Sequence, residues 1–294
     1  MSGLSLQSKI KLNNGLEIPV LGYGLWKTPP EQAEEVAAEA LKVGYRHIDS
    51  AASYKNEAGA GGAIRKTEAA AREDIFFTSK VRLINYEDTK KQVAKTLAET
   101  GLGYIDLMLL HCPYGGSEGR RGAWRALVEA QEAGHVRSIG VSNYGVHHLE
   151  QLEEHISELE AERGAGKGGK INVAQYEIHP WCPRDEIVAW LRARDVVIEA
   201  YSPLVRGERW GEPALRALAE KHGRTEAQVL LRWSLQKGYV PLPKSVTPER
   251  IRQNTEVFDF QLSDEDMKTL VTTEYAPVCW DPTVSPMEGA EGEV

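Results

Sequence analysis

The sequence predicts an α/β protein: one barrel of alternating strands and helices, with an N-terminal β-hairpin before it and an extra C-terminal helix and loop after it. Short runs rich in β-branched and aromatic residues alternate with amphipathic helical segments. Most successive runs begin about 30 residues apart, which is the length of a βαβ unit. Because there are eight such runs, a closed (β/α)8 TIM barrel is favoured over an open doubly wound sheet.

Several of the predicted strands are continuously apolar, as parallel strands buried on both faces are. The eight are LGYGL from Leu21, HIDSA from His47, IFFTSKV from Ile75, IDLMLLH from Ile105, VRSIGVSN from Val136, NVAQYEIH from Asn172, VVIEAYSPL from Val196 and YVPLPKS from Tyr239. Before them, KIKLNNGLEIPV predicts the hairpin, because Asn14-Gly15 is a signal for a type I′ turn. We expect this hairpin to plug the bottom of the barrel.

Amphipathic segments closed by glycine fill intervals between the strands. In residues 31–43 the apolar side chains recur at spacings of three and four, and Gly44 follows at the helix stop. The same pattern returns at residues 87–100, 119–133 and 213–222. After the last strand, SDEDMKTL predicts the extra helix, capped by Ser263. We expect one domain over residues 1–294, with 276–294 a mostly irregular tail whose polar end, GAEGEV, is loose.

Composition and charge restrict the partners of the chain. Its 43 acidic and 35 basic residues give a formal net charge of −8, which excludes a basic nucleic-acid footprint or a polybasic membrane anchor as a global property. No stretch approaches the ~18 apolar residues of a membrane span. The three cysteines lie far apart without C-x-x-C spacing, which favours a reducing compartment. We therefore expect a cytoplasmic protein without nucleic-acid or membrane partners.

The glycine-rich segment GAGKGGK, residues 164–170, contains the spacing G-x-G-x-x-G and almost a P-loop. A dinucleotide fingerprint follows a strand and opens a helix, whereas here a helix ends and a strand begins. Ile171 also stands where a P-loop carries Ser or Thr. We interpret the segment as a flexible connection between a helix and a strand.

Four titratable side chains lie at or just beyond the C-terminal ends of neighbouring predicted strands, where barrels build active sites: Asp49, Tyr54, Lys80 and His111. An ammonium group lowers the pKa of a nearby tyrosine from ~10, and Lys80 supplies that charge to Tyr54. Asp49 keeps the buried Lys80 charged, while His111 orients an oxygen of the substrate. No metal-ligand spacing accompanies them. The set predicts protonation of a carbonyl oxygen while a hydride reaches its carbon.

At these residues the sequence closely resembles the aldo-keto reductases. The matching blocks are G-Y-R-H-I-D-S-A from Gly44, Y-K-N-E from Tyr54, T-S-K ending at Lys80, L-M-L-L-H ending at His111, G-V-S-N from Gly140, Gln175, Y-S-P-L from Tyr201 and P-K-S-V-T-P-E-R-I from Pro243. They follow the order and spacing of the family, and the resemblance extends from about residue 10 to 275. The segment EYAPVCWDPTVSP is more similar to fungal members.

The resemblance implies an NADPH-dependent carbonyl reductase in which Tyr54 is the general acid, Lys80 and Asp49 tune it, and His111 positions the carbonyl. The residues implied to hold the nicotinamide carboxamide are Ser142, Asn143 and Gln175, with Tyr201 stacked on the ring. Those implied along the dinucleotide path are Gly24, Leu25, Ser202 and Leu204. Those implied at the 2′-phosphate, its ribose and the adenine are Lys244, Ser245, Thr247, Arg250, Gln253 and Asn254. At Gln253 the family frequently has a glutamate.

Independently of the resemblance, two cations on the loop after the last predicted strand, Lys244 and Arg250, suit a phosphate dianion. Barrels often bind phosphate after strands seven and eight. Trp26, Trp210 and Trp280 are predicted walls of the substrate pocket, which favours aldehydes or activated ketones with an apolar or aromatic body. We expect a monomer or a weak dimer.

Two other classes of function remain open from the sequence. Barrels of this family also serve as regulatory partners, so a non-catalytic NADPH-sensing subunit is one alternative. A lyase that forms a Schiff base on Lys80 is the other, since lysines in barrels act as nucleophiles elsewhere. Turnover with a panel of aldehydes separates the reductase from the sensor, and borohydride trapping on Lys80 would identify the lyase.

Overall fold

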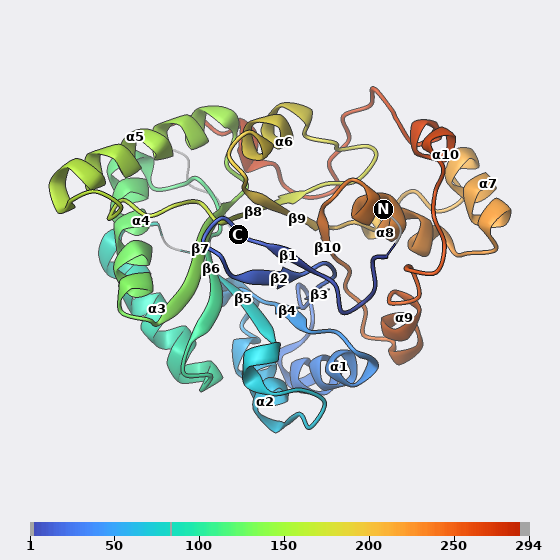
Figure 1. Cartoon of the computed structure of the whole chain (residues 1–294), viewed down its shortest axis with the longest axis horizontal. Helices are drawn as coiled ribbons and strands as arrows, with labels where there is room; N and C mark the ends of the chain where they lie inside the picture. The colour runs from blue at the N-terminus through green and yellow to red at the C-terminus, as the bar shows by residue number, and fades with distance from the viewer. Residues whose placement is uncertain (1–2, 83, 289–294) are drawn as a thin grey trace.

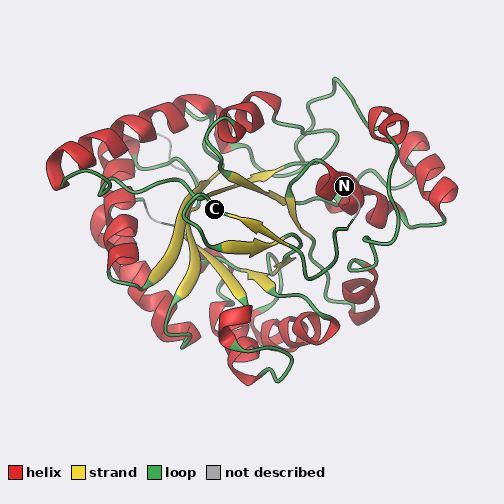
Figure 2. Cartoon of the chain, in the orientation of Figure 1, coloured by secondary structure: helices red, strands yellow, loops and turns green. Residues whose placement is uncertain are grey.

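The computed structural model describes residues 3–82 and 84–288, and it contains a nearly closed barrel of eight parallel strands (Figures 1 and 2). The strands are β3 (Tyr23–Gly24), β4 (His47–Asp49), β5 (Phe76–Val81), β6 (Ile105–Leu110), β7 (Val136–Ser142), β8 (Val173–Glu177), β9 (Val197–Tyr201) and β10 (Val240–Leu242). Each is paired with its neighbour in sequence. At the seam, Gly22 N donates to Pro241 O at 3.1 Å and Gly24 N to Pro243 O at 3.0 Å. The predicted fold class is therefore confirmed.

Helices surround the barrel (Figure 2). They are α1 (Pro30–Val43), α2 (Glu57–Lys66), α3 (Tyr86–Thr100), α4 (Gly116–Glu132), α5 (Val146–Arg163), α6 (Asp185–Arg192), α7 (Pro213–His222), α8 (Glu226–Gln236), α9 (Pro248–Gln253) and α10 (Asp264–Thr269). Gly44 ends α1 in the left-handed conformation and donates to the carbonyls of Ala40 and Leu41, as the glycine stop predicts. Ser263 caps α10, the predicted extra helix. The glycine-rich segment 164–170 connects α5 to β8.

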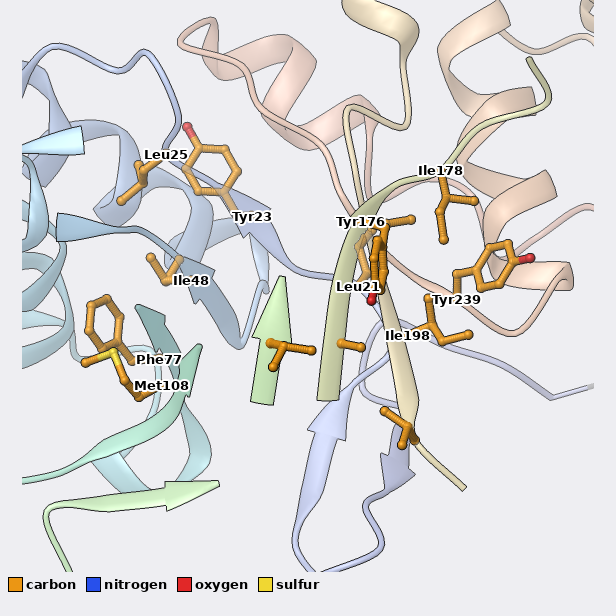
Figure 3. Packing of buried hydrophobic residues seen from close by; sticks show 14 of the residues in the cluster. Leu21, Tyr23, Leu25, Ile48, Phe77, Met108, Tyr176, Ile178, Ile198 and Tyr239 are labelled. Carbon is orange, nitrogen blue, oxygen red and sulfur yellow. The ribbon is translucent and has the colours of Figure 1, made fainter. Parts of the chain in front are cut away.

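Alternation along the barrel strands sends their side chains into two separate apolar clusters of the core. Outward-facing side chains pack under the helices, and Figure 3 labels several of them, including Ile48, Phe77 and Met108. Inward-facing side chains near the bottom of the barrel form a second apolar cluster, which includes Val173 and Val197. Further along the same strands the inward positions are polar. Because the polar inward-facing side chains lie toward the C-terminal ends of the strands, we expect the active site at that end of the barrel.

The N-terminal hairpin closes the bottom of the barrel. Its strands are β1 (Lys9–Lys11) and β2 (Glu17–Pro19) (Figure 1). Leu12 and Ile18 belong to the inner apolar cluster. The predicted type I′ turn is wrong. A type I′ turn requires positive φ at both central residues, Asn14 and Gly15. Gly15 has a φ of +90°, but Asn14 is not among the residues with positive φ. Gly15 N donates to Leu12 O, so Gly15 follows the turn rather than forming its centre.

From Leu270 to Glu288 the chain is irregular apart from a short 3₁₀ turn, Pro282–Val284. It is nevertheless held firmly, because Arg184 Nη1 contacts Asp281 Oδ1 at 2.8 Å and Oδ2 at 3.0 Å. The terminal GAEGEV, expected to be loose, lies outside the described residues. Within residues 3–82 and 84–288, no helix has the length and apolar character needed to cross a membrane.

Candidate active site

A cavity of about 600 Å³ opens at the C-terminal ends of the strands. Its lining comes from the ends of β3, β4, β8, β9 and β10, the loops that follow several strands, and the C-terminal segment. The predicted site residues among this lining are Gly24, Trp26, Asp49, Tyr54, His111, Asn143, Gln175, Tyr201, Ser202, Leu204, Lys244 and Trp280. Leu25 is fully buried, Ser142 is almost so, and neither lines the cavity.

Lys80 lies at the centre of the predicted catalytic set. Its Nζ donates to Asp49 Oδ1 at 2.8 Å and Oδ2 at 2.9 Å, and it lies 3.4 Å from the Tyr54 hydroxyl. The side chains meet because β4 and β5 are neighbours and a 3₁₀ turn, Ala52–Tyr54, follows β4. Burial opposes the positive charge of Lys80, but attraction to Asp49 and Tyr54 outweighs burial and raises the pKa of Lys80. Lys80 is therefore a cation at neutral pH.

The expectation of an unusually acidic Tyr54 is wrong for this structure. Burial raises the pKa of Tyr54 to about 12, and the opposing effect of Lys80 offsets burial only in part, while Asp49 adds to the increase. The phenol thus keeps its proton at neutral pH. Lys80 still favours the phenolate at the moment the proton leaves, so the pair can act as a proton donor with an adjacent stabilising charge.

His111 follows β6 and lies beside Tyr54, with a distance of 5.8 Å between the ring centroids. Burial lowers the pKa of His111 well below its usual range, and Lys80 and Arg82 lower it further. The imidazole is therefore neutral near pH 7 and has one N–H to donate. A neutral donor beside the phenol can hold an oxygen without competing to protonate it.

The residues implied to bind a nicotinamide carboxamide form one hydrogen-bonded group. Ser142 Oγ donates to the backbone carbonyl of Gln175 at 2.9 Å. Asn143 Nδ2 donates to the His111 carbonyl and to Ser142 Oγ, both at 3.0 Å. Tyr201 completes the group by donating its hydroxyl to Asn143 Oδ1 at 2.9 Å. Both amide hydrogens of Asn143 are thus used inside the protein, and its oxygen retains a lone pair.

Of the residues implied to hold the 2′-phosphate and adenine, one lines the cavity and the others come after it in the sequence. Lys244 lines the cavity, whereas Ser245, Thr247, Arg250, Gln253 and Asn254 follow it outside. In the described part of the chain, neither Lys244 nor Arg250 has an acidic ion-pair partner. The side chain of Gln253 is held within its own helix, because its Nε2 donates to Glu249 Oε1 at 3.2 Å. Two unpaired cations with neighbouring hydroxyl groups match the donor set that a phosphate dianion requires.

The structure brings two of the three predicted tryptophan walls into the cavity. Trp26 and Trp280 line it, and Trp280 Nε1 donates to the Tyr114 hydroxyl at 2.8 Å. Trp210 does not belong to the lining; it is 49% exposed and packs near Gly207. From the loop after β9 the cavity lining includes Leu204 and Arg206 but not Trp210.

Two buried glutamates near the site were not predicted. Glu177, at the end of β8, accepts from the backbone amides of Val278 at 2.6 Å and Cys279 at 3.1 Å, and so fixes the C-terminal segment over the cavity. Glu199 is buried on β9 beside Gln175 of β8. In the sequence, each glutamate lies in or at the end of an otherwise apolar run that predicts a buried strand. A buried carboxyl group needs hydrogen-bond partners, so this pattern could have indicated that the two residues have a role in the site.

The eight-stranded barrel thus gathers a tyrosine, a lysine, an aspartate and a histidine at the C-terminal ends of its strands. The model of the Aldo/keto reductase family matches residues 20–274. The chain therefore belongs to the aldo/keto reductase family, which confirms the predicted resemblance.

Individual relatives support this assignment. The chain is 42% identical to an uncharacterized oxidoreductase of Schizosaccharomyces pombe, over 96% of this chain and 100% of that protein. It is 41% identical to glyoxal reductase of Bacillus subtilis, over 90% of this chain and 91% of that protein. The crystal structure of an aldo/keto reductase from Brucella melitensis is similar, with a TM-score of 0.81, 39% identity, and coverage of 90% of this chain and 98% of that chain.

Proposed function

We propose that this chain is an NADPH-dependent reductase that converts aldehydes or ketones to alcohols, with Tyr54 as the general acid. The observation that carries the proposal is the position of the Tyr54 hydroxyl, 3.4 Å from Lys80 Nζ and in the wall of the cavity beside His111. Positioned proton donors typically contribute factors of about 10²–10⁴ to the rate.

Each residue of the set has a distinct role in proton transfer. The neutral His111 donates a hydrogen bond to the carbonyl oxygen and so fixes its position. Tyr54 gives its proton to that oxygen as negative charge develops there. Lys80, kept charged by Asp49, stabilises the phenolate that remains. Trp26 and Trp280 provide apolar surface for the body of the substrate.

The residues at the mouth fit a nicotinamide dinucleotide phosphate. A bound NADPH supplies the hydride that reduces the carbonyl carbon. Asn143 and Gln175 offer acceptor oxygens to a carboxamide, Ser142 supports Asn143, and Tyr201 offers an aromatic face. Gly24, Leu25, Ser202 and Leu204 would lie along the dinucleotide, although Leu25 does not itself line the cavity. Lys244, Ser245, Thr247 and Arg250 would hold the 2′-phosphate and ribose, and Gln253 and Asn254 would bind the adenine.

The state of Lys80 argues against the Schiff-base lyase. A nucleophilic lysine must lose its proton, whereas Asp49 and the carbonyl of Ser50, 2.8 Å away, hold Lys80 as a cation.

The regulatory alternative is tested by turnover. NADPH oxidation should be measured with glyoxal, methylglyoxal and aromatic aldehydes and ketones. Turnover supports the reductase, and tight NADPH binding without turnover across this panel would contradict it.

Arg250→Ala is expected to raise the KM for NADPH by about tenfold or more and to change the KM for NADH little. Loss of a charge-assisted contact to the 2′-phosphate affects only the cofactor that carries this phosphate. Arg252→Ala is the matched control, because Arg252 lies on the same helix but is paired with Glu256 at 2.8 Å. Steady-state kinetics with both cofactors measures the effect. Equal increases for NADPH and NADH would contradict the phosphate contact.

A further inference from the structure

Glu199 is a buried carboxyl group that the proton transfer described above does not use. It lies in the middle of β9 with 0% exposure, next to Gln175 in the register of β8 and β9. Its Oε2 accepts from Gln175 Nε2 at 2.7 Å. Its Oε1 has no hydrogen-bond partner among the described residues, and His47 Nε2 lies 3.4 Å away.

A buried carboxyl group with only one hydrogen bond reduces the stability of the barrel. Removing a carboxyl group from water is unfavourable unless hydrogen bonds replace the lost hydration, and only one bond does so here. An apolar side chain at this position would suit the inner core, where Val197 and Val240 lie nearby on β9 and β10. Packing therefore does not explain Glu199, and its contact with Gln175 is the remaining candidate.

Glu199 and Asp49 together fix the amide of Gln175. Gln175 Nε2 donates one hydrogen to Asp49 Oδ2 at 2.8 Å and the other to Glu199 Oε2. With both hydrogens held, the plane of the amide is determined and the direction of Oε1 follows. Within the described residues no donor contacts Gln175 Oε1, and Gln175 lines the cavity. With Asp49 as the only acceptor, the amide could rotate about a single hydrogen bond.

We propose that Glu199 is a positioning residue for the cofactor: it holds the Gln175 amide by its nitrogen, so that Oε1 accepts from the carboxamide N–H of the nicotinamide. This inference rests on the proposed function. Glu199 acts through Gln175 and does not itself reach the cavity. It thereby selects a ring substituent that can donate a hydrogen bond.

The charges around Glu199 are compatible with this role. Burial and the negative charge of Asp49 raise the pKa of Glu199 to about 8, so the side chain is largely a neutral acid near pH 7. Burial, with a contribution from Lys80, lowers the pKa of His47 to about 3, so His47 is neutral as well. The Lys80–Asp49 pair is therefore not disturbed by a further charge, and a glutamine at position 199 reproduces the neutral acceptor.

The test compares the binding of NADP⁺ with that of its 3-acetylpyridine analogue, whose acetyl group has no N–H. Isothermal titration calorimetry without a carbonyl substrate gives the two dissociation constants and their ratio. We expect wild-type protein to bind the analogue about three- to tenfold more weakly, the loss of one hydrogen bond. Glu199→Leu should bring this ratio close to one, while Glu199→Gln, which keeps an acceptor, should retain most of it.

Stability measurements separate positioning from packing. We expect Glu199→Leu to unfold at the wild-type temperature or above, because it removes an unsupported buried carboxyl group. Val197→Ala, on the same strand, should lower the unfolding temperature without changing the binding ratio. Gln175→Leu should also bring the ratio to one, and it tests the acceptor separately if Glu199→Leu does not fold. A wild-type ratio in Glu199→Leu, or in Gln175→Leu, would overturn the inference.

Failure of the inference can be distinguished from failure of the proposed function. If wild-type protein binds neither NADP⁺ nor the analogue, the proposed function fails and the inference fails with it. If wild-type protein binds both and discriminates between them, but Glu199→Leu discriminates equally well, only the inference fails. If Glu199→Gln loses discrimination to the same extent as Glu199→Leu, the neutral acceptor is not what positions Gln175, and the inference is again overturned.

Discussion

Tyr54→Phe is expected to lower kcat for aldehyde reduction by a factor of about 10²–10⁴ while NADPH binding stays close to the wild-type value. The variant removes only the hydroxyl, which lies 3.4 Å from Lys80 Nζ, and keeps the ring that packs beside His111. Steady-state rates and fluorescence titration of NADPH measure the two quantities separately.

Tyr45→Phe is the matched control for Tyr54→Phe. Tyr45 is fully buried away from the cavity, and its hydroxyl makes a long bond of 3.4 Å to the carbonyl of Ile251. We expect little change in kcat for this control. A Tyr54→Phe protein that reduces aldehydes at the wild-type rate would show that another group donates the proton.

Lys80→Met is expected to lower kcat by a factor of about 10²–10³. Lys80 lowers the pKa of Tyr54 against the effect of burial, so removing the ammonium group raises this pKa further and leaves the phenolate without its stabilising charge. Methionine keeps much of the volume of the side chain. Steady-state kinetics measures the loss of kcat, and thermal unfolding measures the accompanying loss of stability.

The change in stability needs its own control, because Lys80→Met leaves Asp49 buried without a cation, which costs about 3–5 kcal/mol. The double variant Asp49→Asn with Lys80→Met removes both charges. We expect it to recover much of the unfolding temperature but not the rate. Recovery of the rate together with stability would mean that Lys80 contributes only to folding.

The barrel was largely predictable because its strands are buried on both faces and therefore read as apolar runs. Helix α2 shows where this reasoning stops. Its segment EAGAGGAIRK contains three glycines, which weaken a helical pattern. The structure explains them by close packing: a Cβ at Gly61 would collide with the backbone of Thr100 on α3, and one at Gly59 would lie 2.8 Å from Ala33 on α1. Such contacts between helices leave no trace in local periodicity.

In the candidate site, too, features set by nearby sequence could be predicted, and features set by contacts in three dimensions could not. Asp49, Tyr54, Lys80 and His111 could be placed together because each lies at or just beyond the end of a predicted strand. The position of Trp210 depends on the path of a long loop, and the role of Glu199 depends on the register that sets it beside Gln175. The pKa of Tyr54 depends on the balance between burial and a charge 3.4 Å away, which requires coordinates.

The central claim, that a protonated Tyr54 gives its proton to the carbonyl oxygen, is tested most directly by kcat/KM for reduction against pH in wild-type protein and Tyr54→Phe. Tyr54 has a pKa raised to about 12 and stays protonated, while His111 has a lowered pKa and stays neutral. The account predicts a wild-type profile that is level between about pH 5 and 7, below the pKa of about 8 at Glu199, with Tyr54→Phe far below it throughout. Superimposable profiles for the two proteins would contradict it.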